Sequence, residues 1–109
     1  MKTISENLKR GTLELLVLSL LDKQDMYGYE ICRTITEKSD RQFIVLEGSL
    51  YTILYRLGQK GYISDRKELV GTRRTRVYYH LEPAGKEYYE EFLNEYNNFV
   101  EGVSKVLGK

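Results

Sequence analysis

The sequence predicts a mainly helical fold that contains one small β-hairpin. Apolar residues recur at helical spacing along four segments, and two short alternating stretches flank a polar loop that contains a glycine. The length of 109 residues suits one modest core, and 41% hydrophobic with 30% charged residues is ordinary for a globular protein. We expect residues 1–81 and 82–109 to form two parts of one compact unit.

The first predicted helix runs from Ile4 to Lys23. Apolar residues cover nearly the whole circumference of its second half: Leu13, Leu15, Leu16, Val17, Leu18, Leu20 and Leu21. A chain of this size cannot enclose a helix completely. We therefore expect a partner subunit on one side, with Leu13, Leu16 and Leu20 in the interface.

Two further helices are predicted, over Tyr27–Ser39 and Glu47–Lys60. The third helix has two distinct faces. Its apolar face, at i, i+3, i+4 and i+7, holds Leu50, Ile53, Leu54 and Leu57, and its polar stripe holds Ser49, Thr52, Arg56 and Gln59. Gly61 stands where a left-handed cap residue is expected. One face is thus core and the other is presented to solvent.

A β-hairpin follows. Its predicted strands are Tyr62–Leu69 and Arg76–Leu81, and in the second strand apolar and polar residues alternate. The loop between them carries Gly71 for the turn and the neighbouring cations Arg73 and Arg74. The sequence therefore predicts a hairpin with a basic tip.

The last predicted helix starts at Pro83 and runs nearly to the C-terminus. A seam with alternating spacings of three and four consists of Tyr89, Phe92, Tyr96, Phe99, Val103 and Val106. A long helix with such a seam needs another helix to pack on. We expect a homodimer in which this helix contributes Tyr89, Phe92, Tyr96, Phe99 and Val103.

Charge differs between the two parts of the chain. Residues 1–81 hold 14 Lys/Arg against 10 Asp/Glu, whereas residues 82–109 hold 3 against 6. The first part therefore carries a formal charge of +4 and the second −3, which agrees with the overall +1. A basic body with an acidic tail suits contact with a polyanion.

The order of three helices and a basic hairpin is that of a winged helix-turn-helix, here extended by a long C-terminal dimerisation helix. In this fold the third helix enters the major groove of double-stranded DNA. Arg56 would address guanine and Gln59 adenine, beside Ser49 and Thr52. Phosphate contacts are expected from Lys60, Arg73, Arg74 and Arg76, and from the Tyr51 hydroxyl.

A plainer interpretation of the polar stripe is a solvated helix face. The arginine cluster argues against it, because clustered like charges repel unless they meet a counter-charge. Taken together in this order, the two features favour DNA. The alternative function is a winged-helix module that binds protein or RNA without operator binding. A protein-binding module is expected to have an uncharged wing or an apolar third-helix face, and the sequence has neither, whereas a basic wing would serve RNA as well as DNA.

Other classes are excluded by inventory. One cysteine, Cys32, and one histidine, His80, allow neither an intrachain disulfide nor structural zinc, and we expect Cys32 to be a small core residue. The sequence shows no paired nucleophile and base and no glycine-rich phosphate loop, so we predict neither an enzyme nor a cofactor. With no membrane-spanning run and no signal-peptide pattern, a cytoplasmic location is expected.

The sequence resembles the PadR family of transcriptional regulators over roughly residues 8–92. The motifs that carry this resemblance are Arg10-Gly11-Thr12-Leu13-Glu14-Leu15-Leu16-Val17-Leu18, Tyr27-Gly28-Tyr29-Glu30-Ile31, Gly48-Ser49-Leu50-Tyr51, Leu54, Arg56-Leu57, Gly61-Tyr62-Ile63, Arg74, Tyr78-Tyr79 and Gly85. The resemblance implies a winged-helix homodimer that binds palindromic operators, usually as a repressor, through Tyr29, Ser49, Tyr51 and the wing arginines. The chain departs from the family pattern at Glu82, at Gly58 and at Glu47-Gly48.

The short tail is similar to that of PadR regulators that bind drugs. In those relatives a flat aromatic residue at the dimer interface stacks on planar ligands, and Tyr96 lies at the corresponding position. The resemblance thus implies a small aromatic or drug-like effector near Tyr96, Phe92 and Tyr89. The favoured alternative is that these aromatics only form the dimer seam, which packs well without a ligand.

Overall fold

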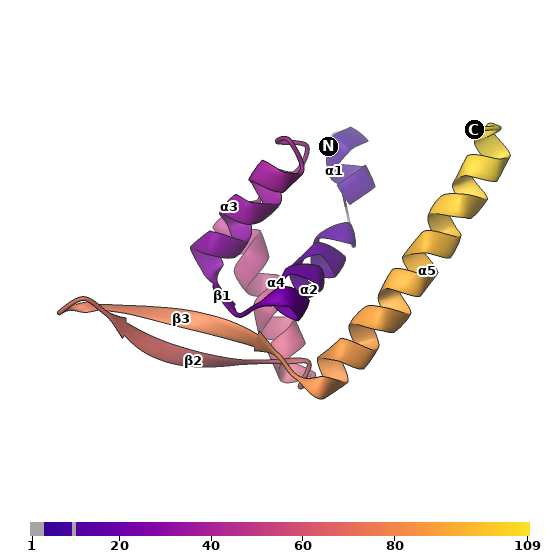
Figure 1. Ribbon diagram of the computed structural model, residues 1–109. Coiled ribbons are helices and arrows are strands. Elements are labelled where there is room, and N and C mark those ends of the chain that lie inside the picture. The colour runs from indigo at the N-terminus through magenta and orange to yellow at the C-terminus, as the bar shows by residue number, and fades with distance from the viewer. Residues whose placement is uncertain (1–3, 10) are drawn as a thin grey trace.

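The computed structural model describes residues 4–9 and 11–109, and it shows a helical body on one side of a small sheet, with a long helix leaving the body (Figure 1). The elements in chain order are α1 (Ile4–Lys9), α2 (Thr12–Lys23), β1 (Met26–Tyr27), α3 (Gly28–Lys38), α4 (Glu47–Gln59), β2 (Ile63–Val70), β3 (Arg74–Leu81) and α5 (Pro83–Leu107). The predicted fold class is confirmed.

The first predicted helix is not continuous, which corrects the expectation of one helix from Ile4 to Lys23. It is divided into α1 and α2, and Gly11 between them has a φ of 84°. This left-handed conformation is open to glycine and interrupts a right-handed helix. Arg10, the first residue of the predicted motif, lies outside the described residues.

The sheet has three antiparallel strands in the order β1-β3-β2, one more than the predicted hairpin. The added strand β1 pairs Met26 with Tyr79 and Tyr27 with Tyr78. Strand β2 is shifted by one residue from the predicted Tyr62–Leu69, and β3 begins two residues before the predicted Arg76, because pairing continues to Val70 and Arg74. Backbone pairing at an exposed hairpin tip needs no apolar side chains, so alternation in the sequence could not reveal it. We call β2, β3 and their turn the wing.

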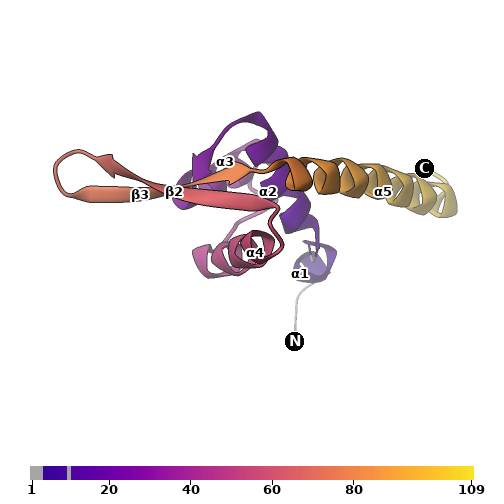
Figure 2. The same ribbon diagram turned by 90° about the horizontal axis from the view of Figure 1, so that it is seen from below.

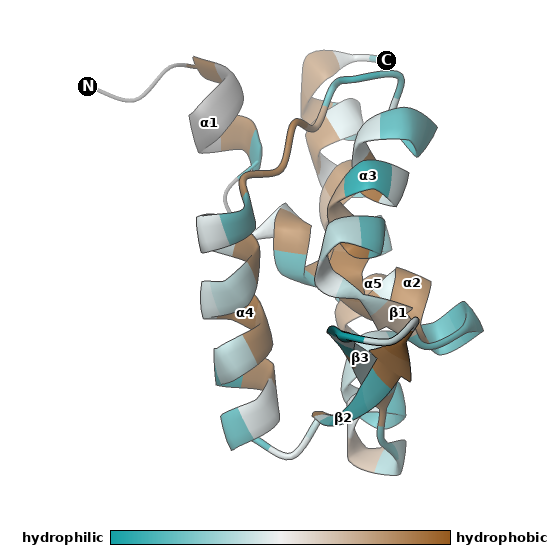
Figure 3. Cartoon of the chain, turned by 90° about the vertical axis from the view of Figure 1, so that its left-hand side faces the viewer, coloured by the Kyte–Doolittle hydropathy of each residue, from teal (hydrophilic) through white to brown (hydrophobic). Residues whose placement is uncertain are grey.

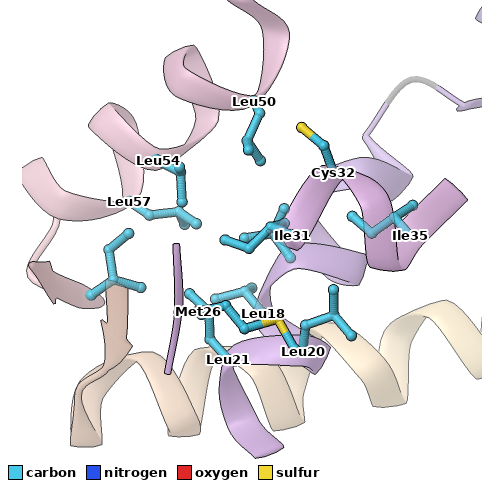
Figure 4. Close-up of a cluster of buried hydrophobic side chains, with 12 residues drawn as sticks. Leu18, Leu20, Leu21, Met26, Ile31, Cys32, Ile35, Leu50, Leu54 and Leu57 are labelled. Atoms are coloured by element: carbon cyan, nitrogen blue, oxygen red, sulfur yellow. The ribbon is translucent and has the colours of Figure 1, made fainter. Parts of the chain in front are cut away.

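The core lies between α2, α3 and α4 and extends to the base of the wing (Figure 4). Its largest fully buried side chains are Leu18, Ile31, Leu50, Leu57 and Val17. Cys32 is buried among them, as predicted. Figure 3 shows the consequence for α4: hydrophobic residues face the rest of the body and polar residues face outward.

Helix α5 begins close against the body and ends far from it. Near its start Gly85 is buried, and a Cβ at this position would lie 2.0 Å from the Tyr62 carbonyl oxygen. The wing and the distal half of α5 extend in opposite directions from the body (Figure 2), and the molecule is 57 Å long. The distal half is therefore a projecting arm with exposed apolar residues.

Candidate nucleic-acid interface

The outer side of α4 presents three polar side chains that the sequence predicted for base contact. Ser49, Thr52 and Gln59 are all exposed, whereas Leu50, Leu54 and Leu57 anchor the opposite side in the core. The Thr52 hydroxyl donates a hydrogen bond to the Gly48 carbonyl oxygen, at 3.1 Å. That bond leaves lone pairs on the hydroxyl oxygen, which can accept from a donor on a base edge.

Arg56, the fourth member of the stripe, is bound within the chain. Its Nη2 donates to Glu14 Oε2 of α2 at 2.9 Å, and its side chain is about half exposed, at 48%. This partner was not predicted from the sequence. A single carboxylate in the apolar segment around Leu15 and Leu16 is the signal that could have indicated it, because such a group needs a cation or donor nearby.

Two tyrosines predicted to contact DNA lie near the starts of α3 and α4. Tyr29 is 55% exposed, and the Arg33 guanidinium lies 5.9 Å from its ring centroid. The Tyr51 hydroxyl packs on Gly28, where an added Cβ would lie 2.7 Å from it. The ring of Tyr51 thus reaches from α4 to the start of α3, and Tyr51 as a whole is 46% exposed.

The cations predicted for phosphate contact lie at the wing tip and at the end of α4. Arg73 is in the turn, Arg74 starts β3, and Lys60 caps α4, all of them exposed. Among the side chains that the structure describes, which exclude those of residues 1–3, 5–7 and 10, no salt bridge joins Arg73 or Arg74 to a carboxylate. Arg76 stacks over the Tyr27 ring at 4.2 Å, which holds its guanidinium beside β1.

The base of the wing is fastened by a carboxylate that was not among the residues predicted from the sequence. Asp25 accepts from Arg66 Nη1 at 2.5 Å, and its other oxygen lies 2.7 Å from His80 Nδ1. The His80 hydrogen bond and then Arg66 hold the pKa of Asp25 below its usual range, although burial opposes this shift. These contacts join the loop before β1 to both strands of the wing.

A groove of about 640 Å³ separates α4 from the inner side of β2. Its walls include Tyr51, Tyr55, Gln59 and Tyr79, and Asp65 is the charged residue among those that line it. A carboxylate repels phosphate. The Asp65 carboxylate therefore makes this groove less suited to phosphate than the wing tip, although Gln59 of the α4 stripe lies on its wall.

The residues predicted for a dimer interface and an effector are not equally accessible on one chain. Tyr96, Phe99 and Val103 are exposed on α5, at 38%, 68% and 41%. The others pack wholly or partly against the chain's own core: Leu20 is buried, and Leu13, Leu16, Tyr89 and Phe92 are partly buried. A second groove, of about 440 Å³ and lined mostly by apolar residues, follows α5 from Asn98 to Leu107.

The described part of the chain offers neither a membrane span nor a cluster of metal ligands. Within it, no helix has the length and apolar character that a membrane crossing requires. Within the same residues, no group of three or more histidine, cysteine, aspartate or glutamate side chains is arranged to hold a metal ion.

Comparisons with known proteins agree with this geometry. Residues 17–91 match the model of the transcriptional regulator PadR-like family. A curated but uncharacterised protein of Lysinibacillus sphaericus is 31% identical over 93 residues, which are 85% of each chain.

Among solved structures, a transcriptional regulator from Clostridium thermocellum is 34% identical, with a TM-score of 0.84 over 94% of this chain and 97% of that one. A PadR family transcription regulator from Clostridium difficile is 30% identical, with a TM-score of 0.75 over 91% of this chain and all of that one. Bacillus subtilis PadR in complex with operator DNA is 27% identical, with a TM-score of 0.69 over 75% of this chain and 47% of that one.

Proposed function

Since this chain belongs to the PadR-like family of transcriptional regulators, we propose that it binds operator DNA through α4 and the wing. The solved complex of Bacillus subtilis PadR supports operator DNA as the ligand. Family membership also makes the chain a regulator rather than an enzyme. As a regulator of transcription it would act in the cytoplasm, where its DNA is.

One observation carries the proposal. The wing tip holds Arg73 and Arg74, which form no salt bridge with a carboxylate among the described side chains, and α4 holds an exposed polar stripe that includes Ser49 and Thr52. Arginines at a loop tip provide phosphate affinity, which does not depend on sequence, whereas short polar side chains on a helix can read base edges. The two surfaces supply the two parts of specific recognition.

We propose further that the active species is a homodimer joined through α5. Phe99, Val103 and Val106 form an exposed apolar stripe on the projecting arm, with Val106 89% exposed. Covering such a stripe with a second copy of the same helix removes apolar surface from water. A two-fold dimer would place two α4 helices on a palindromic site.

Repression and an effector complete the proposal. An operator bound by a dimer is blocked to other proteins, and a planar aromatic ligand at Tyr96 would alter the dimer seam on which operator binding depends. The exposed ring of Tyr96 and the groove along α5 support this placement. A seam that packs without any ligand is the alternative.

Selection from random-sequence DNA duplexes tests sequence-specific binding. We expect the wild-type protein to enrich a palindromic sequence. The double variant Ser49→Ala, Thr52→Ala should lose this preference, while Arg73→Ala, Arg74→Ala should keep the preference and bind more weakly. Absence of any enriched sequence from the wild-type selection contradicts the proposal.

A parallel titration with duplex and single-stranded RNA separates the second candidate function, an RNA-binding winged helix. The basic wing favours this candidate, since phosphates of either polymer attract it. Tighter binding to RNA than to the enriched DNA duplex would replace operator recognition with RNA recognition.

A further inference from the structure

Three helices meet at one carboxylate. Glu14 of α2 accepts a hydrogen bond from Arg56 of α4 on one oxygen and from the Tyr88 hydroxyl of α5 on the other, and both bonds are 2.9 Å long. The three residues are far apart in the sequence, with 42 residues from Glu14 to Arg56 and 74 to Tyr88. We call this group the Glu14 junction.

The junction differs from an ordinary surface ion pair because the Glu14 side chain is only 12% exposed. A carboxylate removed from water needs its charge balanced and its oxygens hydrogen-bonded. Arg56 supplies the charge and Tyr88 the second donor, so the loss of either partner leaves the carboxylate poorly solvated. Glu14 therefore favours arrangements in which both donors stay in place.

Tyr88 is itself held firmly. Its ring stacks on Tyr62 with centroids 4.4 Å apart, and Phe92 lies edge-on at 5.8 Å. Burial and the hydrogen bond to Glu14 raise the pKa of Tyr88 to about 12, so its hydroxyl remains a donor at neutral pH. The position of the first turns of α5 thus determines the position of the hydroxyl.

Arg56 connects the junction to the proposed DNA surface. It lies four residues after Thr52 and three before Gln59, which places these side chains along one side of α4. A guanidinium tied to Glu14 by Nη2 has a restricted orientation but keeps other N–H donors. A shift of α5 that pulls Tyr88 from Glu14 would leave one carboxylate oxygen without its donor and would thereby alter the ion pair between Glu14 and Arg56.

We propose that Glu14 is a positioning residue that couples α5 to α4, so that the packing of α5 sets the orientation of Arg56 for DNA. This inference rests on the proposed function, because it assumes that α4 binds DNA and explains how a change in α5 would reach that surface. The physical basis is one carboxylate of α2, only 12% exposed, whose two oxygens accept hydrogen bonds from α4 and α5.

The test uses changes that remove single atoms or charges from the full chain. Tyr88→Phe removes only the hydroxyl, and Glu14→Gln removes the charge with little change in shape. Tyr62→Phe is the matched control for the first, because it keeps the stacked ring. Glu87→Gln, an exposed neighbour of Tyr88, is the control for the second.

The first readout needs no DNA. The guanidinium signal of Arg56 in a proton–nitrogen NMR spectrum, assigned with Arg56→Lys, should shift in Tyr88→Phe and Glu14→Gln and stay in place in both controls. If the Arg56 signal has the same position in wild type and in Tyr88→Phe, the inference is overturned, whatever the protein binds. Far-ultraviolet circular dichroism of each variant verifies that the fold is retained.

The second readout is affinity for the enriched DNA duplex. Tyr88→Phe should weaken binding about threefold to tenfold in the wild-type background and cause no further loss when Arg56→Gln is already present. Equal losses in both backgrounds, or no loss, overturn the coupling. A wild-type protein that enriches no duplex refutes the proposed function instead, and the NMR readout then decides on the junction alone.

Discussion

At the scale of single residues, two glycines show how closely the helices approach their neighbours. Gly28 accommodates the Tyr51 hydroxyl, and Gly85 accommodates the Tyr62 carbonyl. A side chain at Gly28 meets the movable end of a tyrosine, whereas one at Gly85 meets backbone. The sequence motifs included both glycines, but only the structure shows which atoms exclude a Cβ.

Gly85→Ala is expected to destabilise the protein by about 3 kcal/mol, because the new Cβ would force α5 away from the Tyr62 backbone. Urea denaturation measures this loss. Gly48→Ala, in α4 with nothing within 4 Å of the added Cβ, is the control and should be neutral or stabilising. Equal stability of the two variants would show that the close approach at Gly85 is unimportant.

Asp25 makes the stability of the folded chain depend on pH in the acid range. Its pKa is lowered by His80 and Arg66, so its ionised form stabilises the folded state at neutral pH. That contribution is lost as pH falls below the ordinary value of 3.8 and through the lowered pKa. Asp25→Asn should therefore unfold more readily than wild type at pH 7, and the difference should shrink below pH 4.

Thermal melting across this pH range measures the effect. Asp40→Asn, which removes an exposed carboxylate from the turn after α3, is the control. Its melting temperature should change with pH as that of the wild type does. A difference in melting temperature between wild type and Asp25→Asn that stays constant from pH 7 to below pH 4 would mean that the ionised Asp25 carboxylate does not stabilise the fold through His80 and Arg66.

At the scale of helices and strands, periodicity predicted most of the architecture. The spacing of Leu50, Leu54 and Leu57 is typical of a helix with one buried face. In the structure all three are buried on one side of α4. Strand β1 has two residues, which is too short for any alternation to be visible. It forms because Met26 and Tyr27 pair with residues of β3, which are distant in the sequence.

Gly58 lies inside α4 with nothing within 4 Å of an added Cβ. Gly58→Ala should raise the free energy of unfolding by about 1 kcal/mol, because alanine loses less conformational entropy in a helix. Urea denaturation tests this prediction. A loss of stability would mean that the helix needs glycine at this position for a reason other than space in the folded chain.

At the scale of the whole molecule, side-chain partners were the part that the sequence could not predict. Ser49, Thr52 and the wing-tip arginines are as exposed as the pattern indicated, but Arg56 is bound to Glu14 and Arg76 is stacked on Tyr27. Both partners come from distant parts of the chain. Periodicity assigns a residue to a face and contains no information on which distant group it meets there.

The projecting arm of α5 leads to a prediction about assembly. Phe99→Asp, Val103→Asp should convert a dimer to a monomer, because the exposed stripe would then carry charge that a buried seam cannot solvate. Sedimentation velocity measures the mass. Asn94→Asp, Asn97→Asp adds the same charge away from the stripe and should leave the dimer intact. An unchanged mass in the stripe variant would show that the chains associate elsewhere.

The most direct test of the central claim is the salt dependence of DNA binding. Fluorescence anisotropy with duplexes from the promoter of the protein's own gene would compare wild type, Arg73→Ala, Arg74→Ala and the control Lys105→Ala, Lys109→Ala. We expect tight wild-type binding with a steep negative slope. The wing variant should make the slope shallower by about 0.9 for each phosphate that it no longer neutralises, summed over both chains, and the tail variant should leave it unchanged. Equal slopes for the wing and tail variants, or weak binding that ignores sequence, would contradict DNA recognition through the wing.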